Sequence, residues 1–174
     1  MLKSPMIGLV AGLMLSTAVA IASDKPSDPQ IAHIAYTAGD LDIKAAQLAL
    51  EKSKSETVRA FANDMVRDHK AVNDKALALV KKLNVTPEDN DTSKALVKQA
   101  EEKHTELSKL TGAAFDKAYV DNEVAYHKTV NAALKTTLIP SSSNAELKSL
   151  LETGLKIFEG HLQHAEMLAH GNHK

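Results

Sequence analysis

Three histidines occupy positions where an amphipathic helix would carry an apolar side chain. His69, His127 and His161 each continue the three- and four-residue spacing of the apolar residues around them, and each belongs to a different predicted helix. A histidine on the inward face of a helical bundle brings a nitrogen ligand into the core, and imidazole binds zinc, copper, nickel and iron. The first hypothesis is therefore a transition-metal site inside a helical protein, with iron, copper or zinc as the candidate ion.

Two carboxylates fall beside these histidines when the predicted helices are aligned by length. Asp42 lies next to the inward face of the first helix, and Glu123 precedes His127 by one turn on the same face. Counted from the helix ends, His69 and His127 lie at one level, and His161 lies within a turn or two of it. Carboxylates add the oxygen donors that iron and manganese prefer. The expected ligand set is therefore His69, His127 and His161, assisted by Asp42 and Glu123.

Two other interpretations of these residues stay open. Neutral histidines can form a buried hydrogen-bond network with Asp42, with Glu123 or with one another, which fixes the helix register at some cost in stability. In a protein that meets acid, the same histidines can act as a pH-sensitive switch.

A second run of metal-binding residue types recurs at every third position near the C-terminus: His161, His164, Met167, His170 and His173. Residues three apart are neighbours on a helix, so His161 and His164 can chelate one ion, but the run drifts around the helix and does not converge as a whole. His164 is therefore a weaker candidate ligand. The alternative is an amphipathic helix end with cationic side chains near its negative pole.

The elements that must position these side chains are helices. Aromatic residues make up 3% of the 174-residue chain, which has no Trp, 7 Gly and 5 Pro, whereas strand-rich folds depend on aromatic and β-branched residues and on frequent turns. Apolar residues recur at helical spacing and predict helices over residues 30–53, 55–83, 92–110 and 113–138. A last helix follows a proposed capping box between Ser143 and Glu146 and runs to about His170. We therefore expect an all-α protein.

Helix length decides how these segments pack. A single helix over residues 92–138 would measure about 70 Å at 1.5 Å per residue, against about 43 Å for residues 55–83. Thr111 and Gly112 interrupt the pattern, so that residues 92–110 return along the bundle and residues 113–138 start again from its other end. The prediction is a four-helix bundle with a helical crossover between the second and third main helices, which is the ferritin-like arrangement.

The N-terminus has the pattern of a secretory signal. Lys3 precedes an apolar run that ends in Ala20-Ile21-Ala22, an A-x-A cleavage site, with cleavage after Ala20 and a retained anchor helix as alternatives. The predicted organisation is a signal peptide (1–22), a flexible N-terminus (23–29), the helical bundle (30–170) and a tail (171–174). No segment after the signal is apolar for long enough to span a membrane, so we expect an exported protein.

Several short motifs together resemble one bacterial family. The resemblance covers roughly residues 29–170 and rests on Ala38-Gly39-Asp40, the segment from Phe61 to His69, the segment from Leu110 to Tyr119, Tyr126-His127 and Gly160-His161-Leu162. These segments are similar to the DUF4142 family. The resemblance implies a ferritin-like fold and a bacterial envelope protein of unknown function, either periplasmic or secreted.

The pattern departs from the di-iron site that ferritin-like proteins often carry. Such sites use a Glu three residues before a His on two helices. In this chain Val66, Val124 and Phe158 stand three residues before the histidines. A conventional di-iron site is therefore not expected.

Composition excludes several functional classes. The formal net charge of −1, from 21 Lys and Arg against 22 Asp and Glu, gives no basic surface for nucleic acid. The absence of Cys excludes a disulfide scaffold and a thiolate metal site. No nucleophile motif, phosphate-binding loop or H-E-x-x-H is present, so an enzyme is the less favoured reading.

Two main hypotheses remain. The first is an exported protein that binds a transition metal, with a weak iron oxidase as a variant. The second is a non-catalytic interaction or envelope-stress protein with a buried His/carboxylate network and no metal. The partner, whether a second copy of the chain or another envelope protein, is not determined by the sequence.

Overall fold

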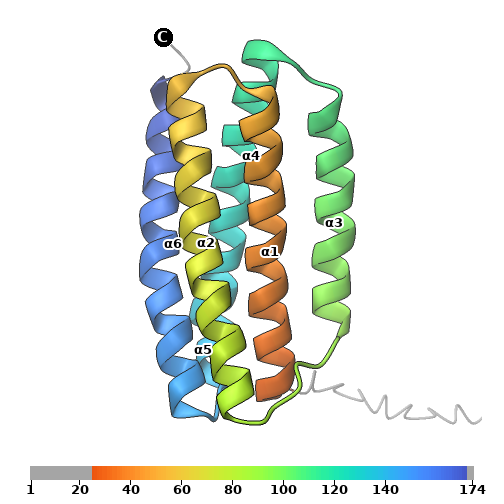
Figure 1. Cartoon of the computed structure of the whole chain (residues 1–174), viewed down its shortest axis with the longest axis vertical. Helices are drawn as coiled ribbons and strands as arrows, with labels where there is room; N and C mark the ends of the chain where they lie inside the picture. The colour runs from red at the N-terminus through yellow and green to blue at the C-terminus, as the bar shows by residue number, and fades with distance from the viewer. Residues whose placement is uncertain (1–24, 172–174) are drawn as a thin grey trace, which may run out of the picture.

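The computed structural model describes residues 25–171, and over this range it contains helices and loops but no strand. Four long helices form the bundle: α1 (Asp28–Lys52), α2 (Glu56–Lys82), α4 (Gly112–Ala133) and α6 (Ala145–Gly171) (Figure 1). The crossover helix α3 (Asp91–Ser108) stands beside α1, outside these four. The all-α bundle with a helical crossover between the second and third main helices is therefore confirmed.

Some expectations fall outside this range. The predicted signal peptide (1–22) and His173 lie outside the described residues. Within residues 25–171, none of the helices combines the length and the apolar character that crossing a bilayer requires.

The chain reverses direction between α3 and α4, and Gly112 lies at this reversal. Its φ of +58° lies in the left-handed region, which a residue without a Cβ adopts at little cost. The crossover ends at Ser108 and α4 starts at Gly112, so α2 and α4 run in the same direction (Figure 1). This parallel pair brings residues at matching distances along α2 and α4 to the same level.

The start of α1 differs from the prediction by two residues. The helix begins at Asp28 rather than at residue 30, because Ser27 and Gln30 form a capping box. The Gln30 backbone N–H donates to Ser27 Oγ (3.4 Å), and the Ser27 N–H donates to Gln30 Oε1 (3.1 Å).

The capping box proposed for the last helix is wrong. Asn144 caps α6 instead, because its Oδ1 accepts hydrogen bonds of 2.9 Å from the backbone N–H groups of Glu146 and Leu147. The Ser143 hydroxyl donates to Asp28 Oδ2 (2.6 Å) and so ties this loop to the start of α1.

The end of α4 also differs from the prediction. The helix passes into a π-helical turn (η1, Leu134–Leu138) and then into a short segment, α5 (Ile139–Ser141), so the chain stays helical past Leu138. Proline lacks an N–H and clashes with the carbonyl four residues before it. The wider π turn, in which the Ile139 N–H bonds to the Leu134 oxygen, accommodates Pro140 without ending the helix there.

The interior has two apolar clusters, one toward each end of the bundle. The first contains Phe61, Met65, Phe115 and Tyr119, and the second contains Ile31, Leu134 and Leu151, each with further aliphatic neighbours. On each main helix, Asp42, His69, Glu123 with His127, or His161 falls between residues of these two clusters in sequence. A polar layer therefore crosses the bundle between two apolar ones.

Candidate metal centre

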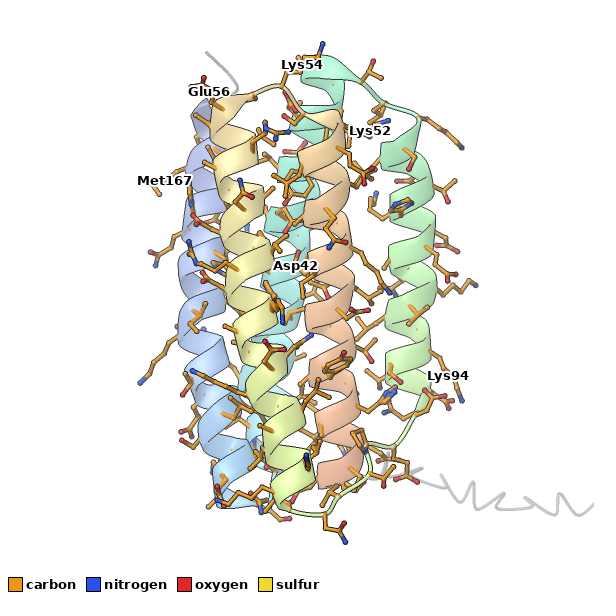
Figure 2. All side chains as sticks on the ribbon, in the orientation of Figure 1. Asp42, Lys52, Lys54, Glu56, Lys94 and Met167 are labelled. Atoms are coloured by element: carbon orange, nitrogen blue, oxygen red, sulfur yellow. The ribbon has the colours of Figure 1, made fainter. Side chains whose placement is uncertain are left out.

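The polar layer takes at least one side chain from each main helix. Asp42 lies on α1, His69 on α2, Glu123 and His127 on α4, and His161 on α6. All five are buried, with relative exposures between 0% for Glu123 and 7% for His161. Asp42 lies near the middle of the bundle's length (Figure 2). The five side chains that the sequence places at about one level therefore do meet in the core.

The three imidazole rings form a compact triangle. Ring centroids are 5.7 Å apart for His69 and His127, 5.3 Å for His69 and His161, and 5.4 Å for His127 and His161. The Phe158 ring stacks on His69 at 4.4 Å, nearly parallel to it. This aromatic contact restricts the rotation of the His69 side chain.

One nitrogen of each imidazole faces an oxygen. His127 Nδ1 lies 3.0 Å from the Glu123 backbone oxygen, and because a carbonyl only accepts, Nδ1 carries the proton. His161 Nε2 donates to Asp68 Oδ2 at 3.0 Å. His69 Nε2 lies 2.5 Å from Asp42 Oδ2, a close contact that is not aligned as a hydrogen bond.

The other nitrogen of each imidazole has no hydrogen-bond partner. These three buried atoms are His69 Nδ1, His127 Nε2 and His161 Nδ1. One ligand atom from each of the three residues lies within 4.8 Å of the others. Ligand nitrogens bonded to one ion at about 2.0–2.1 Å in a tetrahedral site lie about 3.4 Å apart, so a small contraction of the triangle completes a three-nitrogen site.

Unpartnered polar atoms are costly when they are buried, and natural cores contain few of them. Seven such atoms belong to this one layer: both carboxylate oxygens of Asp42, both ring nitrogens of His69, and one atom each of Glu123, His127 and His161; the Tyr119 hydroxyl, one turn before Glu123, is an eighth. Their concentration at one place supports a ligand for the layer.

The carboxylates form a second triad with one of the histidines. Ligand atoms of Asp42, Glu123 and His127 lie within 4.8 Å of one another. Asp42 Oδ2 is 3.7 Å from His127 Nε2, and Glu123 Oε2 is 3.6 Å from His127 Nδ1. Oxygen donors therefore stand next to the three-nitrogen triad.

Electrostatics keep the two carboxyl groups in different states. Burial and the neighbouring Asp42 charge raise the pKa of Glu123 well above its ordinary value, which favours the neutral form of Glu123. Burial acts on the pKa of Asp42 in the same direction, but the positive charge that His69 and His127 carry when they are protonated outweighs it and leaves that pKa low. Asp42 is therefore the anionic member of the layer.

Burial also acts on the imidazoles. It lowers the pKa of His127 to about 4, although the Asp42 charge opposes the shift. Burial likewise lowers the pKa of His161, against the opposing bond from Asp68. Both rings are therefore neutral at pH 7, which is the state in which imidazole binds a metal.

Two polar groups of the site were not predicted. Asp68, on α2, accepts the hydrogen bond from His161. The Tyr119 hydroxyl is buried without a hydrogen-bond partner, one turn before Glu123. The position of Asp68 directly before His69 was the available signal, because a residue next to an inward one on a helix faces the neighbouring helix. Asp68 does not itself occupy an inward-facing position in the periodic pattern of the helix, so the periodicity alone did not predict it.

The remaining candidates do not join the centre. His164 is half-buried with its ring edge-on to Phe61 at 5.1 Å, outside the imidazole triangle. Met167 is 65% exposed and points away from the bundle (Figure 2). His170 is exposed. Among the described residues, the C-terminal run therefore does not form a convergent group of ligands.

The family model of DUF4142, a domain of unknown function, matches residues 14–168. No curated protein matches the chain.

Three solved structures resemble the bundle. A DUF305 protein from Streptomyces coelicolor, described as a candidate secreted protein, is 11% identical over 82% of this chain and 91% of its own, with a TM-score of 0.68. A DUF305 fragment from Deinococcus radiodurans is 15% identical over 83% of this chain and 97% of its own, with a TM-score of 0.70. CopM in its Cu(II)-bound form is 13% identical over 84% of this chain and 98% of its own, with a TM-score of 0.63. At these identities the likeness concerns the fold alone.

Proposed function

Because the chain belongs to the DUF4142 family, whose function is unknown, we propose from its own residues that it binds one transition-metal ion in the core of the bundle. His69 Nδ1, His127 Nε2 and His161 Nδ1 are the nitrogen ligands, and Asp42 supplies the nearest anionic oxygen. The observation that carries this proposal is that three buried imidazoles, each with a ring nitrogen that has no hydrogen-bond partner, offer ligand atoms within 4.8 Å of one another.

The surroundings of each imidazole support this role. Metal-bound histidines commonly donate their second ring nitrogen to a carboxylate or a backbone carbonyl, which fixes the tautomer and the ring orientation. The Glu123 carbonyl does this for His127 and Asp68 does it for His161, while Asp42 stands beside His69. The bonds to one ring nitrogen of His127 and one of His161 leave the other nitrogen of each ring free.

The donor set favours copper(II) over zinc and iron. Affinities of nitrogen and oxygen sites for divalent ions rise along the first transition series to copper. The copper-bound neighbour CopM, which shares the fold, supports the same choice. We further propose that the protein is exported and acts in the periplasm or outside the cell, on the basis of its predicted signal peptide and of the candidate secreted neighbour.

Metal analysis and thermal unfolding test the proposal. The protein, prepared without a histidine tag, is freed of metal with chelator and then melted with Cu(II), Zn(II) or Fe(II). An ion that binds the folded state at 100 times its Kd stabilises it by about 2.7 kcal/mol, which raises the melting midpoint by several degrees. We expect the largest rise with Cu(II), at one ion per chain.

His127→Leu separates metal binding from the alternative of a metal-free network. The variant should lose the metal-induced rise, whereas His170→Leu, at an exposed position, should keep it. Without metal, the variant should be at least as stable as the unaltered protein, because Leu removes a buried unpaired nitrogen. A large loss of stability without metal, together with no binding by the unaltered protein, would establish the network instead.

A further inference from the structure

Beneath the crossover helix lies a cavity of about 800 Å³. Its walls come from α1, α3 and α4 and include Leu41, Ala45, Leu96, Ala100, Ala125 and Val130. In Figure 1, α3 stands apart from the bundle along most of its length. The cavity therefore follows the seam between α1 and α4 that α3 covers.

The crossover helix is anchored at its ends rather than along its middle. Its buried residues are Ser93 near the start and Leu107 near the end. The Asn90 side chain donates to the Gln30 carbonyl (3.4 Å) before α3, and Lys52 Nζ donates to the Ser108 carbonyl (2.6 Å) at its end. A helix with so few buried side chains can separate locally from the bundle without global unfolding.

The floor of the cavity reaches the candidate metal centre. Asp42 is among the residues that line it, together with Asn122 and Tyr126 from α4, although Asp42 is only 1% exposed. The Tyr126 hydroxyl donates to the Ala38 carbonyl (2.7 Å) and so bridges α4 and α1 next to this point. Of the five residues of the centre, Asp42 is the one that lines the cavity.

The opposite face of the bundle offers a less favourable path for a cation. There His161 is held by Asp68, and Arg67 pairs with both oxygens of that carboxylate at 2.8 and 3.1 Å. An ion that approaches between α2 and α6 therefore meets a guanidinium charge. The cavity under α3 also has cationic side chains, Lys44 and Lys103, but it adds four metal-binding residue types, namely His33, Asp40, Glu101 and His104.

We propose that the metal ion reaches and leaves the centre through the seam between α1 and α4, and that local separation of α3 controls the rate of exchange. This inference rests on the proposed metal-binding function. Asp42 is then the first residue of the centre that an incoming ion meets, and the three imidazoles are reached after it.

The first experiment measures access without any metal. Because the chain has no cysteine, Asp42→Cys provides a unique thiol at the floor of the cavity. Its alkylation by iodoacetamide, a small neutral reagent, should be slow in the folded protein and complete in urea. Adding Leu107→Ala, which removes the buried anchor of α3, should speed alkylation at least 10-fold.

A matched control separates local from global opening. Leu151→Ala removes a leucine of α6 that is buried to a similar degree and does not line the cavity. Leu151→Ala should leave the alkylation rate within about twofold of the rate measured for Asp42→Cys alone, because this change destabilises the bundle without releasing α3. Equal acceleration by both variants would show that global unfolding exposes position 42 and would overturn the proposal.

The second experiment follows the metal, with Asp42 intact. Stopped-flow loading of Cu(II) should be at least 10-fold faster in Leu107→Ala than in Leu151→Ala. If Arg67→Ala accelerates loading and Leu107→Ala does not, the ion enters between α2 and α6, and the inference is wrong. If the unaltered protein binds no metal, the proposed function fails, while alkylation of Cys at position 42 still decides whether the seam opens under α3.

Discussion

His161 on α6 donates its Nε2–H to Oδ2 of Asp68 on α2 at 3.0 Å. This bond leaves Nδ1 of His161 as the unprotonated nitrogen, buried and without a hydrogen-bond partner, in a ring whose centroid lies 5.3 Å from that of His69 and 5.4 Å from that of His127. Asp68 itself is 26% exposed, so the polar layer is connected through it to the surface of the bundle. Asp68 therefore orients a candidate ligand without being one.

Loss of the Asp68 charge should weaken metal binding. Asp68→Asn keeps the shape of the side chain but no longer offers a charged acceptor to His161, and such changes beside a metal ligand typically cost 10- to 100-fold in affinity. Asp64→Asn is the matched control, because Asp64 pairs with the same Arg67 (2.7 Å) and is not a partner of His161. Titration calorimetry measures the Cu(II) affinity of both variants. Equal affinities of Asp68→Asn and Asp64→Asn would show that Asp68 does not contribute to metal binding.

The stability of the metal-free protein should depend on pH through His127. Burial lowers the pKa of His127 from 6.5 to about 4, so between these values the unfolded chain binds more protons at this position than the folded chain. The His127 contribution to stability is therefore present above pH 6.5 and is lost as the pH falls toward 4, by up to about 3 kcal/mol. Urea unfolding between pH 7 and 4 should show a smaller acid loss in His127→Leu than in the unaltered protein; parallel curves would contradict the assignment.

Glu123→Gln should distinguish the two triads. Burial and Asp42 raise the pKa of Glu123 and so favour its neutral form in the fold, which Gln resembles in shape and charge. If the three imidazoles hold the ion, the variant should retain Cu(II) affinity within a few fold; if Glu123 is a ligand, affinity should fall by orders of magnitude.

The same variant should also change the pH dependence in the opposite sense to His127→Leu. A raised carboxyl pKa means that the folded chain holds the proton above pH 4.5 while the unfolded chain releases it, so this contribution to stability is lost as the pH rises. Glu123→Gln should remove that loss and unfold at higher urea concentration at pH 8. No difference at pH 8 would show that Glu123 is ionised in the fold.

Two helical glycines should respond to alanine with opposite signs. A Cβ at Gly39 would overlap the side-chain amide of Asn73, which donates to the Tyr36 carbonyl (3.2 Å) and joins α2 to α1 one turn from His69 and Asp42. Gly39→Ala should therefore cost about 1–3 kcal/mol. At Gly160 nothing lies within 4 Å of the added carbon, so Gly160→Ala should stabilise the helix by about 0.5–1 kcal/mol.

Urea unfolding of the metal-free variants measures both changes. Gly39→Ala should also weaken Cu(II) binding, because the α1–α2 spacing sets the approach of Asp42 to His69. A neutral effect of Gly39→Ala on both stability and binding would show that this spacing adjusts without cost.

Much of this architecture follows from local rules that a single sequence carries. Helical periodicity determines which face of each helix turns inward, and it placed Asp42, His69, His127 and His161 on those faces. Gly112 marked the reversal because a left-handed backbone is a property of the residue itself. Helix lengths then put α2 and α4 in parallel and their histidines at one level. The helix ends were less well determined, because the cap at Asn144 and the π turn before Pro140 depend on competition between neighbouring local bonds.

Tertiary structure alone decided which atoms of the site are free. The protonated nitrogen of His161 is set by Asp68 on another helix, and the pKa of Glu123 is raised by burial between the helices and by Asp42 on α1. Periodicity states only which face a residue occupies. The rotation and spacing of packed helices decide which side chains meet across a seam, and these depend on long-range contacts such as the one between Gly39 and Asn73. For the same reason the cavity under α3 was not foreseen, since it is a space between helices and has no pattern of its own in the sequence.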